Sequence, residues 1–130
     1  FKAWSDGRSY TNPPETVTVI YENVEFNPDC AYDPTTGIWT CPTAGAWMFV
    51  STMHLSDNFG TPNRLMYFNV KGVNYLTAYG ASSSEKTLEG ARAFNLEVGD
   101  KVKVNLYYST YSAPFTGDGN FFFGFRLRTE

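Results

Sequence analysis

Hydrophobic side chains recur at every second position in several stretches of this sequence, and this period limits the fold more than any other feature. The residues that share one side of each stretch are Trp47, Phe49 and Met53; Met66, Phe68 and Val70; Val102, Val104 and Leu106; and Val17, Val19 and Tyr21. Such alternation is typical of half-buried β-strands, and no window shows the 3.6-residue period of an amphipathic helix. Short clusters of Gly, Pro, Asn and Asp separate the stretches, and none is long enough to be a domain linker. The sequence therefore predicts one all-β domain over residues 1–130, a sandwich or a barrel.

Several predicted strands are apolar on both faces, notably those around Trp47, Met66 and Phe122. A two-layer sandwich buries only one face of each sheet, so the second apolar face needs another covering layer. Because no helix is predicted that could supply this layer, another copy of the same chain is the economical source. The pattern predicts an oligomer.

The composition argues against some classes of partner. Charged residues make up only 18% of the chain, and the formal net charge is −3. Nucleic acid binding needs a clustered positive field, whereas the ten Lys and Arg residues are scattered. No segment approaches the ~20 consecutive apolar residues of a membrane span. We expect neither nucleic acid binding nor membrane insertion. Because the chain starts at Phe1, we also expect it to be a processed or excised piece of a longer protein.

Candidate catalytic groups are few. His54 is the only histidine and lies in a predicted strand. No G-x-S-x-G motif is present, neither cysteine has a plausible histidine partner, and no recognisable carboxylate pair stands out. The sequence predicts a protein that is not an enzyme, without catalytic residues and without a required cofactor.

The two cysteines, Cys30 and Cys41, flank a predicted turn at residues 33–37. If the hairpin closes there, they lie nearly opposite each other on adjacent strands, where a disulfide is geometrically possible. Two buried free thiols are the alternative. We favour the disulfide, because a surface hairpin of this kind fits an oxidising compartment. With one histidine and no C-x-x-C spacing, the sequence argues against a structural zinc site.

Three separated motifs carry a family resemblance. Residues 32–49 read YDPTTGIWTCPTAGAWMF, residues 94–102 read FNLEVGDKV, and residues 122–127 read FFGFRL. In this order they resemble the complement C1q domain, whose patterns are close to Y-D-x-x-T-G-x-F-T-x-P-x-x-G-x-Y-x-F, L-x-L-x-x-G-D-x-V and F-S-G-F-x-L. Trp39 and Trp47 stand where the family usually has Phe and Tyr. The resemblance implies a ten-stranded jelly-roll sandwich like that of the tumour necrosis factor cytokines. It also implies a compact homotrimer, commonly joined to a collagen-like or coiled-coil stalk.

The strand phasing and the resemblance together suggest site residues. Phe122 and Phe125 have opposite parity, so one should enter the core and the other the subunit contact. We expect Tyr67, Tyr107 and Phe122 to lie at the three-fold interface. Rim aromatics are the alternative, since tyrosine tolerates a wet edge.

Loop residues supply the ligand and metal candidates. Ligand-binding aromatics are expected at Tyr75, Tyr79, Tyr111 and Phe115. Some C1q-like trimers hold calcium, and hard oxygen ligands in loops suit this ion. Asp118, in a predicted turn at residues 117–120, is the best candidate ligand for calcium, followed by Asp57. Ordinary polar turns are the alternative, and we favour it.

The resulting functional expectation is a non-enzymatic trimeric recognition head, secreted or displayed on a surface. It would bind protein or carbohydrate ligands through its loops and the grooves between subunits. The alternative is a structural or receptor-binding head of a virion fibre or a spore-surface protein. The absence of an N-x-S/T sequon mildly favours this alternative, because secreted animal proteins often carry one.

Overall fold

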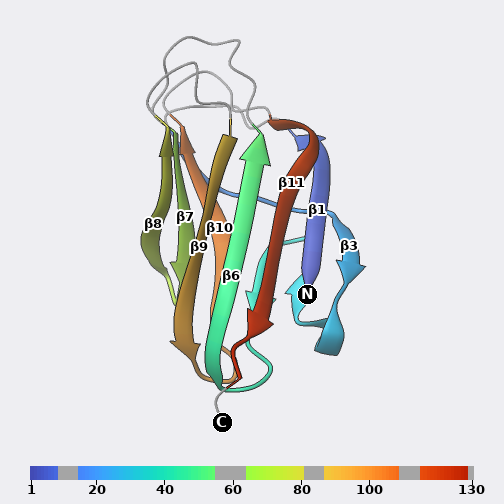
Figure 1. Cartoon of the computed structure of the whole chain (residues 1–130), viewed down its shortest axis with the longest axis vertical. Helices are drawn as coiled ribbons and strands as arrows, with labels where there is room; N and C mark the ends of the chain where they lie inside the picture. Colours follow the sequence, from blue (N-terminus) through green and yellow to red (C-terminus); the bar gives the residue numbers. More distant parts are fainter. Residues whose placement is uncertain (9–14, 55–63, 81–86, 109–114, 129–130) are drawn as a thin grey trace.

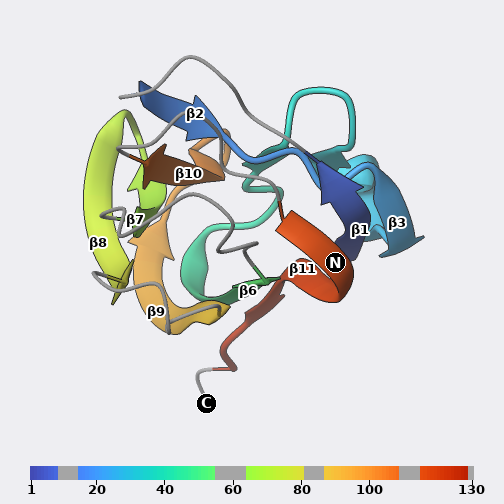
Figure 2. The same ribbon diagram turned by 90° about the horizontal axis from the view of Figure 1, so that it is seen from above.

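Two antiparallel β-sheets pack face to face in the structure, a computed structural model that describes residues 1–8, 15–54, 64–80, 87–108 and 115–128 (Figures 1 and 2). The predicted all-β jelly-roll sandwich is confirmed. The described residues form eleven strands rather than ten, because the segment between residues 23 and 40 is divided into three short strands and one 3-10 turn.

The first sheet has five strands and faces the viewer in Figure 1. Their order across the sheet is β3 (Asn23–Phe26), β1 (Lys2–Arg8), β11 (Phe115–Arg126), β6 (Gly45–His54) and β9 (Thr87–Leu96). Strand β11, far along the chain, therefore lies between β1 and β6. The backbones of Phe1 and Gly124 meet here, since the Gly124 N–H donates to the Phe1 carbonyl at 3.2 Å.

The second sheet lies behind the first and has six strands. Their order is β4 (Tyr32–Asp33), β5 (Ile38–Thr40), β10 (Lys101–Tyr108), β7 (Arg64–Val70) and β8 (Val73–Gly80). Strand β2 (Glu15–Thr18) pairs with residues 105–108, farther along the same edge of β10 that β5 occupies at residues 101–102. The 3-10 turn η1 (Pro28–Cys30) connects β3 to β4.

A tight hairpin joins β7 to β8. Val70 pairs with Val73, which leaves Lys71 and Gly72 as a two-residue loop. Both loop residues have positive φ, 54° at Lys71 and 83° at Gly72. This is the backbone of a type I′ turn, whose twist matches that of the two strands it connects. The turn thereby sets the register of the hairpin.

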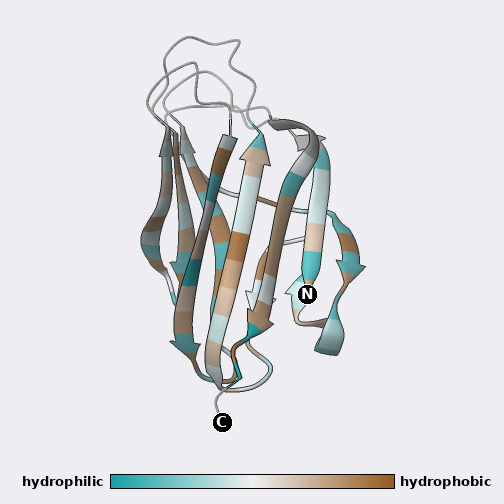
Figure 3. Ribbon diagram, viewed as in Figure 1, coloured by the Kyte–Doolittle hydropathy of each residue, from teal (hydrophilic) through white to brown (hydrophobic). Residues whose placement is uncertain are grey.

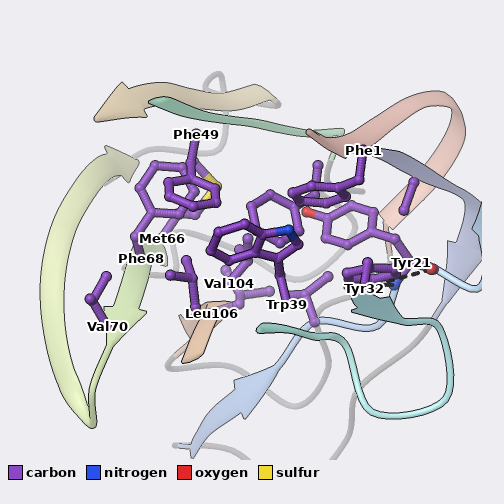
Figure 4. Close-up of a cluster of buried hydrophobic side chains, with 14 of the residues drawn as sticks. Phe1, Tyr21, Tyr32, Trp39, Phe49, Met66, Phe68, Val70, Val104 and Leu106 are labelled. Carbon is purple, nitrogen blue, oxygen red and sulfur yellow. Dashed lines mark hydrogen bonds between the residues drawn. The ribbon is translucent and has the colours of Figure 1, made fainter. Parts of the chain in front are cut away.

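The core lies between the two sheets (Figure 4). Its largest fully buried side chains are Trp39, Tyr21, Tyr32, Phe49, Phe68, Phe122, Met53, Met66, Leu106 and Val19. The alternation in the sequence placed most of these side chains on the buried faces, so that part of the prediction is confirmed. Two polar atoms in this core are paired, because the hydroxyls of Tyr21 and Ser51 lie 2.9 Å apart.

The predicted turn at residues 117–120 is wrong, because these residues belong to strand β11. The register shows how the strand accommodates them. Ser5 of β1 pairs with Asn120, but Gly7 pairs with Thr116, so β11 has two more residues than β1 over this interval. The Gly-rich segment therefore forms an irregularity within the ladder rather than a loop.

Candidate binding surfaces

The outer face of the five-stranded sheet carries a ladder of phenylalanines on β11. In Figure 3 much of the β11 ribbon is coloured as hydrophobic. The ring centroids of Phe121 and Phe123 lie 5.7 Å apart, those of Phe123 and Phe125 lie 6.3 Å apart, and both pairs are stacked. Phe125 is 47% exposed. Next to this ladder, Met48 and Val50 of β6 are half-buried and pair with Phe125 and Phe123. We call these five residues the aromatic face.

Strand β3 extends this apolar surface at the edge of the sheet. Phe26 is 54% exposed and Val24 is 37% exposed. Between β3 and the ladder, the Lys2 ammonium lies 5.9 Å from the ring centroid of Phe121 and 3.0 Å from a carboxylate oxygen of Glu25. The cation therefore covers one end of the ladder, while Phe125 at the other end remains exposed.

Phe122 occupies the core, so its predicted place at a subunit interface is wrong. The side chain is completely buried within its own chain and packs against Phe1, Tyr32 and Phe49. The opposite parity of Phe122 and Phe125 is confirmed, since Phe125 lies on the outer face. Alternation predicts that these two residues face opposite ways, but it does not say which of them faces inward.

A second exposed apolar group lies on strand β8, at the other side of the sandwich from β3 (Figure 1). Val73, Leu76 and Tyr79 are each about half exposed, at 52%, 50% and 53%. We call these three residues the β8 edge. Just inside it, the Arg92 guanidinium lies 5.3 Å from the ring centroid of Tyr75 and donates to the Leu76 carbonyl at 3.1 Å. Arg92 thus links β8 of one sheet to β9 of the other.

Tyr67 and Tyr107 lie on the outer face of the six-stranded sheet, on the other side of the sandwich from the aromatic face. Between them, Asn105 is only 7% exposed, and its amide donates to the Asn74 side-chain oxygen at 3.0 Å. The Asn69 amide donates to the same oxygen at 2.8 Å. The surroundings of the two tyrosines are therefore polar, and their predicted role in a subunit contact stays a prediction.

The four predicted ligand-binding aromatics have different surroundings. Tyr79 is exposed on the β8 edge, whereas Tyr75 is half-buried, 5.1 Å from the ring centroid of Phe94. Phe115 is the first residue of β11 and pairs with Arg8 of β1, and its side chain is outside the described part. Tyr111 lies outside the described residues. Of the four, Tyr79 is the one that the structure places on an open surface.

The metal candidates do not come together in the described structure. Asp118 belongs to β11 but its side chain is not among those described, and Asp57 lies outside the described residues. Within the described ranges, no three His, Cys, Asp or Glu side chains are grouped so that they could hold a metal ion. His54, at the end of β6, lies with its Nδ1 3.2 Å from the Thr87 hydroxyl.

The predicted disulfide is wrong, since Cys30 and Cys41 are both free thiols. Tyr32 pairs with Trp39, so the register would indeed bring the two cysteines opposite each other. However, β4 does not extend back to Cys30. This residue belongs to η1 instead, where its φ is 50°. As a result Cys30 is exposed, while Cys41 is buried and its thiol lies 3.2 Å from the Thr43 carbonyl. Both line the same open cavity, of about 450 Å³.

A second cavity was not foreseen from the sequence. It has a volume of about 460 Å³, and six of its twelve lining residues are aromatic, namely Phe1, Phe26, Trp39, Trp47, Phe123 and Phe125. Asp29 and Arg126 also line it. We call it the aromatic cavity. Trp39, Trp47 and Phe123 all line this cavity, and each stands at a position where the sequence departs from the C1q patterns. These departures are the signal that the sequence offers.

Comparison with known proteins gives a consistent result. The family model of the C1q domain matches residues 3–127. The search of curated proteins found no match. Among solved structures, the globular domain of zebrafish complement 1qA protein is 16% identical, with a TM-score of 0.61 over 97% of this chain and 100% of that chain. Murine APRIL is 17% identical, with a TM-score of 0.63 over 97% of this chain and 95% of that chain.

A third solved structure, the Eiger TNF of S. frugiperda, is 12% identical, with a TM-score of 0.55 over 95% of this chain and 93% of that chain. At these identities the likeness concerns the fold. In the described part of the chain, no helix has the length and apolarity needed to cross a membrane. Since the family model matches almost the whole sequence and the two-sheet sandwich agrees with it, the chain belongs to the C1q domain family.

Proposed function

We propose that this chain is one subunit of an extracellular homotrimeric recognition head, without enzymatic activity, that binds a protein or carbohydrate ligand. Family membership supports the trimer, the binding of a protein ligand, the extracellular location and the lack of enzymatic activity. Domains of the C1q and tumour necrosis factor families are generally non-enzymatic binding modules, form trimers, and are typically extracellular or secreted. The single observation that carries the proposal for this chain is its aromatic face.

The aromatic face is difficult to explain in an isolated chain. The outer side of an antiparallel sheet is normally polar, because only the inner side contributes to the core. Here Phe121, Phe123 and Phe125 stack along the outer side of a central strand, with exposed Phe26 nearby. Large contiguous apolar surfaces of this kind are typical of protein interfaces. A second copy of the chain would remove these rings from water.

The arrangement of the two apolar surfaces favours a closed ring. A two-fold dimer buries the same surface on both partners, whereas a cyclic trimer needs two different surfaces that fit each other. The aromatic face with β3 and the β8 edge lie at different sides of the sandwich. Each copy can therefore present its β8 edge to the aromatic face of the next copy, and three such contacts close the ring.

The oligomeric state tests this part of the proposal. Light scattering should give about three times the chain mass of 14.6 kDa. Phe123→Asp should reduce the mass to that of one chain, because it places a charge in a dry contact, while the circular dichroism spectrum of the strands is retained. Tyr107→Asp, on the other side of the sandwich, should leave the trimer intact, in contrast to the contact role that the sequence predicts for Tyr107. A monomeric wild type contradicts the proposal, and a trimer split by Tyr107→Asp but not by Phe123→Asp assigns the contact to the other sheet.

Ligand binding is tested separately. Tyr79 is the exposed member of the predicted ligand-binding set and also belongs to the β8 edge, so it lies where a groove between copies would form. Its variant is therefore compared with wild type only if light scattering still gives the mass of a trimer. Glycan and protein arrays probed with the wild-type head should identify a ligand. Tyr79→Ala should weaken its binding about tenfold if the ring stacks on the ligand. A trimer that binds no component of either array would contradict the recognition role but not the assembly.

A further inference from the structure

We propose that the aromatic cavity binds a small, flat, apolar molecule that carries one carbonyl or carboxylate oxygen. The cavity volume of about 460 Å³ falls within the ~300–1,000 Å³ of known ligand sites. Aromatic residues make up half of its lining, and only Asp29 and Arg126 among the lining residues are charged. A flat ligand can stack against such rings and exclude water from them.

The hydrogen-bonding requirement of the ligand comes from Trp39. This side chain is 1% exposed and lines the cavity. The indole N–H of Trp47 donates to the Thr43 carbonyl at 2.9 Å, but the indole N–H of Trp39 has no acceptor among the described residues. A buried donor without an acceptor is rare in native proteins and calls for an explanation. A ligand oxygen would satisfy it.

The orientation of the Trp39 ring agrees with this role. In Figure 4 the edge of the indole that carries the nitrogen is turned toward Phe1, which also lines the cavity. The two rings are stacked, with centroids 6.0 Å apart. Beside them, Gly124 has no room for a side chain, because an added Cβ would lie 2.8 Å from both Phe1 and Phe49. This part of the cavity wall is therefore closely packed.

The charged groups lining the cavity define two versions of the ligand. Arg126 donates from Nη2 to the Ala44 carbonyl at 2.7 Å, which leaves its other N–H groups for a ligand. Asp29 lines the same cavity with the opposite charge. A carboxylate would use Arg126 as well as Trp39, whereas a neutral carbonyl would use Trp39 alone. Both versions share an acceptor oxygen on an apolar ring system.

Nuclear magnetic resonance of the indole N–H groups tests the proposal on the wild-type protein. The probes are 2-naphthamide, 2-naphthoate and unsubstituted naphthalene. We expect both oxygen-bearing probes to shift the Trp39 signal saturably and more than the signals of Trp4 and Trp47. Naphthalene should bind more weakly than the oxygen-bearing probes. It should not shift the Trp39 indole signal in the direction in which those probes shift it. Equal affinity of naphthalene and 2-naphthamide would overturn the proposal, as would equal shifts of all three indoles.

Two variants sharpen the test. Trp39→Phe keeps an aromatic ring but removes the donor, so it should weaken 2-naphthamide binding about tenfold and change naphthalene binding less than about twofold. Arg126→Gln should weaken the binding of 2-naphthoate selectively if the site is built for an acid that uses Arg126 as well as Trp39. It should change the binding of neither oxygen-bearing probe if the site holds a neutral carbonyl through Trp39 alone. Loss of binding of all three probes on Trp39→Phe would assign a purely apolar role to this ring and overturn the proposal.

A neighbouring copy is the competing occupant, because Phe123 and Phe125 line the cavity and also belong to the aromatic face. The titrations are therefore repeated at two protein concentrations, one below and one above the concentration at which light scattering shows the chains to associate. A Trp39 signal that follows the protein concentration and ignores the probes would assign the cavity to the subunit contact. That result would overturn the ligand site while leaving the trimer in place.

Discussion

The Tyr32 hydroxyl makes two hydrogen bonds to the backbone of Tyr21, accepting from its N–H at 3.0 Å and donating to its carbonyl at 3.1 Å. Both residues are buried, at 1% and 0% exposure. The Tyr32 side chain thus fixes the backbone of Tyr21, which lies in the irregular segment after β2. Buried backbone groups require such partners, because their desolvation is costly when they are unpaired.

Tyr32→Phe should therefore destabilise the fold by about 2 kcal/mol, since it removes both hydrogen bonds and fills the same space. Urea unfolding monitored by circular dichroism measures this change. The control is Tyr67→Phe on the outer face of the six-stranded sheet, which should change the free energy of unfolding by less than about 0.5 kcal/mol. Equal effects of the two substitutions would show that the pair with Tyr21 contributes nothing special.

Gly90→Ala should destabilise the fold by about 1–3 kcal/mol through overpacking. A Cβ at Gly90 would overlap the Thr77 methyl group and lie 2.9 Å from the Thr77 carbonyl oxygen, at the seam between β9 and β8. Adding Thr77→Ser to this variant removes the methyl group, so it should restore part of the loss. A double-mutant cycle by urea unfolding gives the coupling energy. Additive effects would mean that the two residues do not meet.

The two thiols should react at different rates. Cys30 is exposed, whereas burial raises the pKa of the Cys41 thiol and keeps it protonated. A thiol reagent such as dithionitrobenzoate should modify one group per native chain quickly and the second only as the protein unfolds. Cys30→Ser should abolish the fast phase. Two fast groups would contradict the burial of Cys41, and no reactive group with a mass lower by two hydrogens would reveal the disulfide that the sequence suggested.

Asp100 should make part of the stability dependent on pH. The Glu97 N–H, 2.7 Å from the carboxylate, is the main cause that lowers the pKa of Asp100 below its ordinary value of 3.8, and Lys71 at 3.1 Å adds to it. Because the folded pKa is the lower one, the stabilisation is present above the unfolded pKa and is lost as the pH falls through the folded value. The urea midpoint of Asp100→Asn should therefore fall less than that of wild type between pH 7 and pH 3. Equal falls would contradict the assignment.

The sequence predicted the fold well because alternation is a local signal that the core confirms. Phe49, Met53, Phe68 and Val104 all face inward as expected. What it could not predict is absolute orientation where both faces are apolar. The prediction therefore places Phe122 on the wrong side of β11, because Phe121, Phe122, Phe123 and Phe125 together offer rings to both faces.

The prediction of a disulfide between Cys30 and Cys41 is wrong for a different reason. The predicted strand register is correct. However, Asp29 and Cys30 adopt left-handed conformations, with φ of 60° and 50°, and neither is a glycine, so the sequence does not signal the change of direction. The prediction of a turn at residues 117–120 is wrong for the opposite reason, because the glycines that suggest a turn lie within a strand. The aromatic cavity brings together rings from five separate parts of the chain, so the alternation within any one strand could not reveal it.

The position of β11 between β1 and β6 has a consequence for biosynthesis. The middle of the five-stranded sheet is supplied by residues 115–126, while its neighbours are supplied by residues 2–8 and 45–54. As the chain leaves the ribosome, both neighbours emerge long before the strand that joins them. Until it arrives their edges remain unpaired and open to other chains. We expect the nascent chain to depend on chaperones during this interval.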